Sequence, residues 1–238
     1  VSADRQLHTS YLTPHQEGSG LRKRSVHLFL FFSISIFGIV VVNQLNISAL
    51  NEMQEAFIEA AEKDGDLILL SATGSGKTLA FLIPVLKKLD PNLSHTQALI
   101  ITPSRELALQ IEKVFKSLQS GFKVTCCYGG HLRETEERNL VEAPALIIGT
   151  PGRLADHIRR ENIKTEHIET LVLDEFDKSL EFGFKDEMAF IVGKIKRNAK
   201  KILTSATDLQ DIPPFTQVKN PIQLDFLEHA SPVTNDLS

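Results

Sequence analysis

Residues 71–78, SATGSGKT, decide the fold of this chain. They follow an apolar run at 67–70 and lead into a segment of helical character at 77–89. A buried strand, a glycine-containing turn and a helix N-terminus in this order form a phosphate-binding loop. Gly74 and Gly76 let the backbone turn tightly and approach phosphates, because no Cβ stands in the way. The exposed N–H groups of such a loop face the bound anion.

The side chains of this loop supply the chemistry of a nucleotide site. We expect Lys77 to reach the outer phosphates and the Thr78 hydroxyl to hold Mg²⁺. The usual pattern opens with Gly or Ala, and Ser71 stands in that place. The alternative is an ordinary strand–turn–helix corner that binds nothing. The predicted nucleotide-binding residues of the loop are Ser71, Ala72, Thr73, Gly74, Ser75, Gly76, Lys77 and Thr78.

The composition is that of a soluble protein with a core. The chain has 238 residues, of which 42% are hydrophobic and 24% charged, and its formal net charge is −4. Any contact with RNA or DNA must therefore come from local basic patches. Cys126 and Cys127 are adjacent in an apolar run, which indicates reduced core residues of a cytoplasmic protein. The eight histidines show no metal-site spacing, so we interpret them as surface or core residues.

Residues 1–44 differ in character from the rest. Basic residues at 22–24 precede an almost wholly apolar run at 28–42, a pattern typical of a signal peptide or signal anchor. An anchor in this orientation would export the following domain, away from ATP. We therefore expect residues 1–43 to be no part of the fold and expect no stable membrane partner. A membrane anchor through residues 26–45 and a buried helix or strand are the alternatives.

From residue 46 onwards, apolar runs alternate with amphipathic segments. This alternation predicts an α/β fold with a mostly parallel twisted sheet and helices on both faces. Besides the strand at 67–70, strands are expected at 97–102, 122–128, 145–149, 171–173, 201–204 and 222–226. Besides the helix at 77–89, helices are expected at 50–62, 104–118 and 178–195, the last interrupted near Gly183, and one is expected to begin at Pro151.

Polar clusters follow five of the predicted strands. In a parallel sheet these strand ends share one edge, where ligands bind. Asp174 directly after a buried strand suits Mg²⁺, and Glu175 can deprotonate an attacking water. Besides the phosphate loop, the clusters are PSREL at 103–107, TPGR at 150–153, DEFD at 174–177 and SAT at 205–207.

In this order, and with the Gly129-Gly130 pair, these motifs resemble the first RecA-like domain of a DEAD-box RNA helicase. The resemblance covers residues 45–230. It implies a P-loop NTPase domain over that range, an atypical segment at 1–44, and the start of a linker at 231–238 leading to a second RecA-like domain absent from this chain. It also implies ATP and Mg²⁺ as cofactors and RNA as a partner bound through its backbone.

The resemblance also implies roles for individual residues. Lys77, Asp174 and Glu175 are catalytic, with Asp174 holding Mg²⁺ partly through water. Gln54 reads adenine; the alternative is an exposed glutamine at a helix start. Asp177 contacts Ser205 and Thr207, and these three residues couple the nucleotide site to strand separation. Residues that bind RNA are Pro103, Ser104, Arg105, Gly129, Gly130, Thr150, Pro151, Gly152 and Arg153.

The sequence thus favours the ATP- and RNA-binding domain of an ATP-dependent RNA helicase that is inactive without its second domain. One alternative is a module that binds nucleotide or RNA without turnover; another is a different P-loop ATPase or a DNA helicase domain. A separate basic cluster indicates a solvated helix end, with a second RNA patch as the alternative. Its members are Lys194, Lys196, Arg197, Lys200 and Lys201.

Overall fold

The computed structural model describes residues 49–209 and 211–227, which all belong to one compact unit. Within these two ranges, no helix has the length and apolar character needed to span a bilayer. The expectations for residues 1–44, including the apolar run at 28–42, and for residues 231–238 lie outside the described part of the chain.

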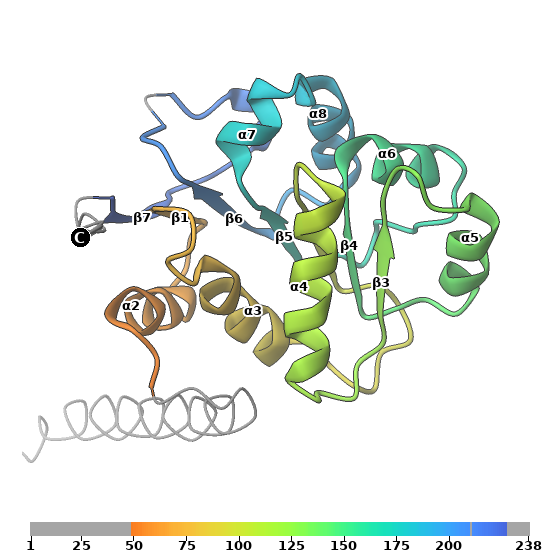
Figure 1. The fold of residues 1–238 in the computed structure, drawn as a ribbon, viewed down its shortest axis with the longest axis horizontal. Helices are drawn as coiled ribbons and strands as arrows, with labels where there is room; N and C mark the ends of the chain where they lie inside the picture. Colours follow the sequence, from red (N-terminus) through yellow and green to blue (C-terminus); the bar gives the residue numbers. More distant parts are fainter. Residues whose placement is uncertain (1–48, 210, 228–238) are drawn as a thin grey trace, which may run out of the picture. The chain divides into compact units, whose positions relative to one another are not determined.

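The described residues form a single sheet of seven parallel strands in the order β3-β4-β2-β5-β6-β1-β7 (Figure 1). The strand that precedes the phosphate loop, β1, therefore lies between β6 and β7. The strands are β1 (Leu67–Ser71), β2 (Ala98–Ile101), β3 (Val124–Cys127), β4 (Leu146–Gly149), β5 (Thr170–Leu173), β6 (Lys200–Ser205) and β7 (Ile222–Phe226).

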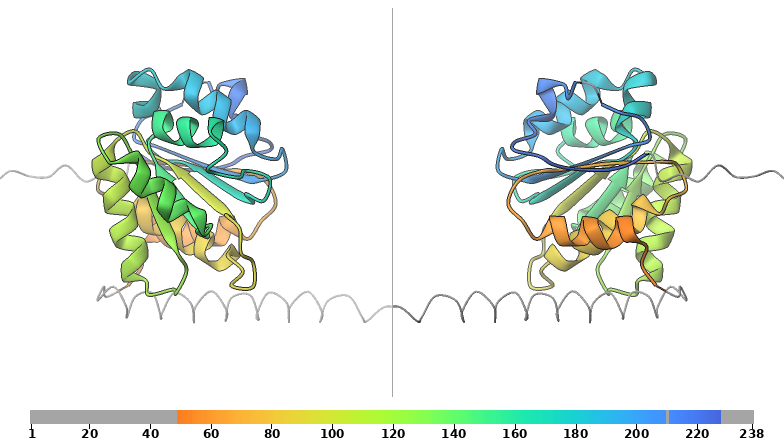
Figure 2. Two further views of the ribbon diagram at one scale, coloured as in Figure 1. Left: turned by 90° about the vertical axis from the view of Figure 1, so that its right-hand side faces the viewer. Right: turned by 90° about the vertical axis from the view of Figure 1, so that its left-hand side faces the viewer.

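Helices cover both faces of this sheet. The side views of Figure 2 place α2, α3 and α4 on one face and α6, α7 and α8 on the other. This is the three-layer arrangement that parallel strands with crossover helices require. The helices are α2 (Glu52–Ala61), α3 (Lys77–Lys88), α4 (Arg105–Ser117), α5 (Arg133–Val141), α6 (Pro151–Arg159), α7 (Phe176–Glu181) and α8 (Lys185–Lys194), with a short 3₁₀ turn η1 (Pro214–Thr216).

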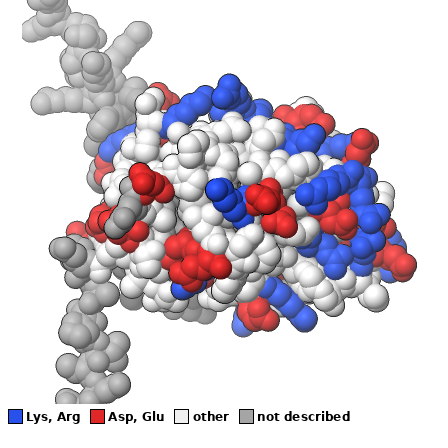
Figure 3. Space-filling view, turned by 90° about the horizontal axis from the view of Figure 1, so that it is seen from above, with Lys and Arg blue, Asp and Glu red and all other residues white. Residues whose placement is uncertain are grey.

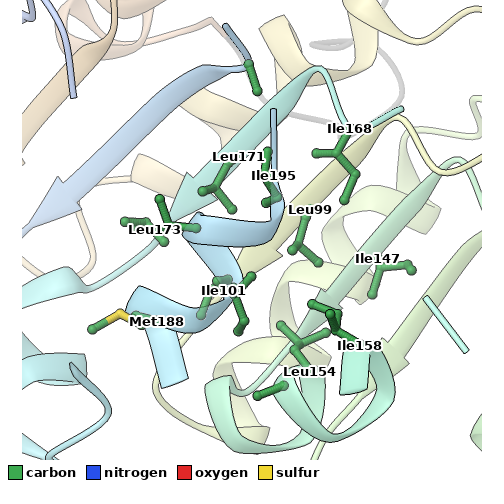
Figure 4. Packing of buried hydrophobic residues seen from close by; sticks show 14 of the residues in the cluster. Leu99, Ile101, Ile147, Leu154, Ile158, Ile168, Leu171, Leu173, Met188 and Ile195 are labelled. Atoms are coloured by element: carbon green, nitrogen blue, oxygen red, sulfur yellow. The ribbon is translucent and has the colours of Figure 1, made fainter. Parts of the chain in front are cut away.

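The core forms because the central strands are apolar on both sides. Every residue of β1, β2, β4 and β5 is buried, as expected for a sheet covered on both faces. Figure 4 shows Ile101 of β2 and Leu173 of β5 near Met188 of α8, and Leu154 of α6 belongs to the same cluster. This packing makes the sheet a rigid platform for the loops at its edge.

The predicted fold class and all seven predicted strands are confirmed. The predicted helices are also present, and the interruption near Gly183 separates α7 from α8. The helix α5 and the turn η1 were not predicted. The residues that α5 buries are Glu136 and Leu140, so its sequence lacks the apolar stripe that signals a packed helix.

Strand register aligns the polar residues that follow the strands. Leu173 of β5 is paired with Ile101 of β2 and with Leu203 of β6. Because the strands are parallel, the next residue of each, Asp174 and Thr204 among them, lies at the same edge of the sheet. Leu70 of β1 is paired with Ser205, which brings the phosphate loop to that edge as well.

A buried aspartate holds the opposite edge of the sheet, where the amino-terminal ends of the strands lie. Both carboxylate oxygens of Asp66 accept backbone N–H bonds at 2.7 Å, one from Lys201 and one from Lys219. The Lys201 side chain is buried too, and its ammonium donates to the carbonyls of Arg197 and Ala199. The interpretation of this lysine cluster as a solvated helix end is therefore wrong for Lys201, whose charge is held by backbone carbonyls at the start of β6.

Candidate nucleotide and RNA site

The phosphate loop needs glycine at its last turn. Gly76 is the N-cap of α3 and has a φ of 94°, in the left-handed region that side chains disfavour. A Cβ built on Gly76 would lie 2.6 Å from Nε2 of Gln54, closer than real contacts allow. Gly74 also has a positive φ, of 82°. The glycines expected to shape the loop therefore do so.

Lys77 is folded back onto the loop. Its ammonium donates to the carbonyls of Ser71 at 2.6 Å and Ala72 at 2.9 Å. Burial lowers the pKa of Lys77, although the charges of Asp174 and Glu175 partly oppose this shift. Lys77 is thus a buried cation close to carboxylates, held where the loop would meet phosphate oxygens.

Ser71, the departure from the usual loop pattern, has a contact that neither Gly nor Ala could make. Its hydroxyl is hydrogen-bonded to the hydroxyl of Ser75 at 2.8 Å across the loop. Ser71 itself is buried at the end of β1. The serine is therefore compatible with the loop and braces it from within.

The start of α2 is attached to the same loop. Asn51 and Gln54 form a capping box in which each side chain accepts the other's backbone N–H, at 2.9 and 3.0 Å. Their amide nitrogens also donate into the loop, Asn51 to the carbonyl of Ser75 at 3.0 Å and Gln54 to that of Gly76 at 3.2 Å. Gln54 is 7% exposed, so the alternative of an exposed helix-start glutamine is wrong.

Asp174 and Thr204 form the acidic centre of the site. The Thr204 hydroxyl donates to Oδ1 of Asp174 at 2.6 Å and accepts the backbone N–H of Glu175 at 3.1 Å. Thr204 was not among the predicted site residues. The strand register given above explains the contact, because Asp174 and Thr204 follow paired residues.

The surroundings of Asp174 suit a bound divalent cation. Burial raises the pKa of Asp174 to about 6, against the donation from Thr204. A buried carboxylate beside the negative Glu175 is costly without a positive partner. Mg²⁺ prefers carboxylate, water and phosphate oxygens, and in phosphate loops it also binds a Ser or Thr hydroxyl. Asp174 and the partly exposed Thr78 offer two of these oxygen types at one edge of the sheet, so the residues fit the metal that the sequence predicts.

The raised pKa predicts that Asp174→Asn stabilises the protein without ligands. The folded protein holds a proton at Asp174 more tightly than the unfolded chain, in which the pKa of this carboxyl is near 3.8. Its free energy of unfolding therefore falls as the pH rises from about 4 to about 6. The neutral amide of the variant avoids this cost, so we expect a gain of about 2–3 kcal/mol at neutral pH and almost none near pH 4.

Urea unfolding at both pH values measures this gain. Asp208→Asn, a change of the same kind at an exposed residue, is the matched control and should leave the midpoint nearly unchanged. An Asp174→Asn variant that is no more stable than the wild type at neutral pH would contradict the assignment of a strained buried carboxylate.

Glu175 has a strained backbone. Its φ of 46° and ψ of 54° are left-handed, although it carries a full side chain. Such conformations cost free energy and are found mainly at functional sites. The bond from its N–H to Thr204 holds it in this conformation at the start of α7. Glu175 is partly exposed, so it remains open to water.

Asp177, Thr207 and Ser205 form a second polar group beside this centre. The Thr207 hydroxyl donates to Oδ2 of Asp177 at 3.0 Å, as expected. Ser205 reaches Asp177 only through Thr207, because its hydroxyl donates to the Thr207 carbonyl at 2.6 Å. The direct Ser205–Asp177 contact that was expected is therefore not formed. Oδ1 of Asp177 is buried without a hydrogen-bond partner among the described residues, which leaves one acceptor free.

Arg105 lies beside the Gly129-Gly130 turn. Its guanidinium lies over the ring of Tyr128, 5.1 Å from the centroid, and a Cβ on Gly130 would lie 3.9 Å from its Nη1. Arg105, Gly129 and Gly130 are exposed. Pro103 is buried, and Ser104 caps α4 by accepting the N–H of Leu107 at 3.3 Å. These two residues therefore shape the turn that presents Arg105.

The start of α6 holds the remaining RNA candidates. Thr150 is the N-cap, Pro151 is the buried first residue, and Gly152 is exposed. The side chain of Arg153 is only 13% exposed and donates from Nη2 to the carbonyl of His131 at 2.9 Å.

Seen from above in Figure 3, Lys and Arg gather towards the right, the side on which Figure 1 draws α5 and α6.

A buried group lies beneath these turns. Cys127, Glu136 and His157 place one potential metal-binding atom each within 4.8 Å of the others, although their sequence positions show no metal-site spacing. Nε2 of His157 is already hydrogen-bonded to Glu136 at 2.7 Å, and burial strongly raises the pKa of the Cys127 thiol. The group is therefore an internal hydrogen-bonded cluster, and Cys126 and Cys127 are free cysteines, as predicted.

A cavity of about 470 Å³ lies at the amino-terminal ends of the strands, among the segments that precede β2 and β4. The rings of His95 and His167 lie there with their centroids 4.2 Å apart and their planes tilted by 30°. None of the predicted site residues lines this cavity. Because it lacks a glycine-containing turn and a phosphate loop, we do not assign the nucleotide to it. Its walls include Ser94, Thr96, Leu140, Val141 and Pro144.

Comparison with known proteins identifies the family. Residues 51–212 match the family model of the DEAD/DEAH box helicases. The chain belongs to this family. It is 40% identical over 168 residues to the ATP-dependent RNA helicase CshA of Listeria monocytogenes, covering 70% of this chain and 32% of that protein. It is 37% identical over 176 residues to the ATP-dependent RNA helicase eIF4A of Aspergillus oryzae, covering 72% and 42% respectively.

The fold of this DEAD-box chain is also that of a solved family structure. A DEAD box protein from the hyperthermophile Methanococcus jannaschii superposes with a TM-score of 0.71 at 26% sequence identity. The match covers 78% of this chain and 52% of the other. The fold is therefore the RecA-like domain that the motifs indicated. The chain spans about a third to two-fifths of the length of the two helicases above.

Proposed function

We propose that this chain is the ATP- and RNA-binding domain of an ATP-dependent RNA helicase. The observation that carries the proposal is the convergence of two kinds of site at one edge of the sheet. The phosphate loop and Asp174 form the first, and the turns at Arg105 and Gly130 form the second. Membership of the DEAD/DEAH box family and the names of the relatives support it.

In the nucleotide site, the loop N–H groups and Lys77 bind the phosphates of ATP. Thr78 and Asp174 would hold Mg²⁺, which neutralises phosphate charge when bound. Glu175 takes a proton from the attacking water. Gln54 still has one N–H and one acceptor lone pair beyond its contacts with Asn51 and Gly76, which suffices for the adenine edge.

In the RNA site, backbone groups and Arg105 grip the phosphates without reading the bases. Asp177, Thr207 and Ser205 link this grip to the nucleotide, because they lie just after β5 and at the end of β6, close in the chain to Asp174 and Thr204. Remodelling of RNA duplexes requires closure onto a second RecA-like domain, which we propose as the partner of this edge.

RNA binding can be tested at Arg105. We expect Arg105→Ala to weaken binding of single-stranded RNA by roughly fivefold and to lower the slope of log affinity against log salt by about one. Fluorescence anisotropy at several salt concentrations measures both. Arg197→Ala removes the same charge at the opposite edge, so its effect should be much smaller. Equal losses of RNA affinity in the two variants would show that Arg105 contributes only non-specific electrostatic attraction.

A further inference from the structure

A buried carboxylate on α5 lies between the two segments proposed to bind RNA, the Gly129-Gly130 turn and the start of α6. These are called the RNA-facing segments. Glu136 is fully buried, whereas most residues of α5 are partly or fully exposed. Burying a carboxylate costs several kcal/mol unless donors surround it. Neither the sequence motifs nor the proposed chemistry uses Glu136, so its burial needs another explanation.

Donors from both RNA-facing segments converge on Glu136. Oε1 accepts the backbone N–H of Tyr128 at 3.1 Å and lies 3.3 Å from Nδ1 of His131. These residues flank the Gly129-Gly130 turn. Oε2 lies 2.7 Å from Nε2 of His157 and 3.6 Å from Nε of Arg153, both on α6. One carboxylate thus ties the turn after β3 to the first turns of α6.

The orientation of His157 shows that this group is built as a unit. Its Nδ1 lies 3.1 Å from the amide nitrogen of Asn162, which can only donate. With Nδ1 accepting this hydrogen bond, Nε2 is the ring nitrogen that donates to Glu136. Arg153 closes the ring of contacts by donating to the carbonyl of His131.

We propose that Glu136 is a positioning residue for RNA binding. It holds the Gly129-Gly130 turn and the start of α6 in one fixed arrangement, so that their backbone groups meet the same RNA strand without first being ordered. Preorganisation of this kind strengthens binding by removing the entropic cost of fixing loops. The inference rests on the RNA-binding function proposed above.

A comparison of two glutamates separates this role from simple electrostatics. Glu136→Gln and Glu134→Gln each remove one negative charge from α5, and Glu134 is exposed. Charge alone would make both variants bind RNA slightly more tightly. Positioning predicts that Glu136→Gln binds RNA about five- to tenfold more weakly, because charge-assisted bonds are lost at the turn and at α6. Glu134→Gln should bind at least as tightly as the wild type.

The measurement is fluorescence anisotropy with a labelled single-stranded RNA and the full 238-residue chain. Mg-ATP affinity, measured in parallel, should stay within about twofold in Glu136→Gln, because the phosphate loop lies on the other side of β5 and β6. Amide exchange at Tyr128 should quicken while exchange at residues 67–78 stays unchanged. A general loss of structure would instead change both affinities and both regions.

If Glu136→Gln does not fold, His157→Leu replaces it, since this variant keeps the carboxylate and its side chain has no donor for Oε2. It should show the same selective loss of RNA affinity. Unchanged RNA affinity in the folded variant would overturn the positioning role and leave the proposed function standing. A wild-type chain that binds no RNA would overturn the proposed function and this inference with it.

Discussion

Lys77→Ala is expected to lower the affinity for Mg-ATP by about 10- to 100-fold, the value of one or two charge-assisted hydrogen bonds to phosphate. The charged groups that act on Lys77 are the carboxylates Asp174, Glu175 and Asp177. Without the ammonium, the loop faces these negative charges with backbone dipoles alone. The triphosphate then meets repulsion at the very edge where it must bind.

Isothermal titration calorimetry with Mg-ATP measures this loss. Lys88→Ala is the matched control, because Lys88 lies in the last turn of the same helix and is exposed. Its affinity should equal that of the wild type. Thermal unfolding should show that the Lys77 variant remains folded. An Mg-ATP affinity equal to that of the wild type in a folded Lys77→Ala variant would show that the phosphate loop does not bind the nucleotide.

ATP turnover by a polypeptide of these 238 residues is expected to be very slow and insensitive to RNA. Among the described residues, the charges that shift the pKa of Lys77 are the carboxylates Asp174, Glu175 and Asp177, and no arginine is one of them. An arginine that contacts the transferring phosphate is worth about 10³–10⁵ in rate. Lys77 and Mg²⁺ can hold ATP, but they leave the charge that develops on the γ-phosphate incompletely neutralised.

Phosphate release with and without single-stranded RNA measures this turnover, and duplex displacement is followed alongside. The comparison is the same chain joined to a second RecA-like domain from the family, which should restore RNA-stimulated turnover. Rapid RNA-stimulated hydrolysis by the 238-residue chain itself would show that a second copy, or a group outside the described residues, supplies the missing cation.

The sheet and the position of the site could be predicted because both depend on short-range patterns. Central strands of a parallel sheet are buried on both faces, so they appear as uninterrupted apolar runs such as Leu67–Leu70. Parallel order then brings the residues after each run to one edge, whatever the order of the strands. Asp174 and the phosphate loop were placed together for this reason.

The contacts that hold the site together depend on register and tertiary packing, which the sequence does not display. Thr204 lies inside β6, and only the pairing of β6 with β5 shows that its hydroxyl bonds Asp174. Lys201 was predicted to be solvated, and no motif drew attention to Glu136, because charged residues are rarely fully buried unless paired. Their partners are backbone groups and side chains of other elements. The tie between Asn51 and Ser75 spans α2 and the loop in the same way.

Backbone amide NMR with Mg-ATP shows where ATP binds, which we propose is the phosphate loop beside Asp174. We expect the largest chemical-shift changes at residues 73–78 and at Glu175, whose N–H bonds Thr204. Changes at His95 and His167 should be small, because they line the cavity at the opposite edge. Shift changes centred on that cavity, with the loop amides unmoved, would contradict the account.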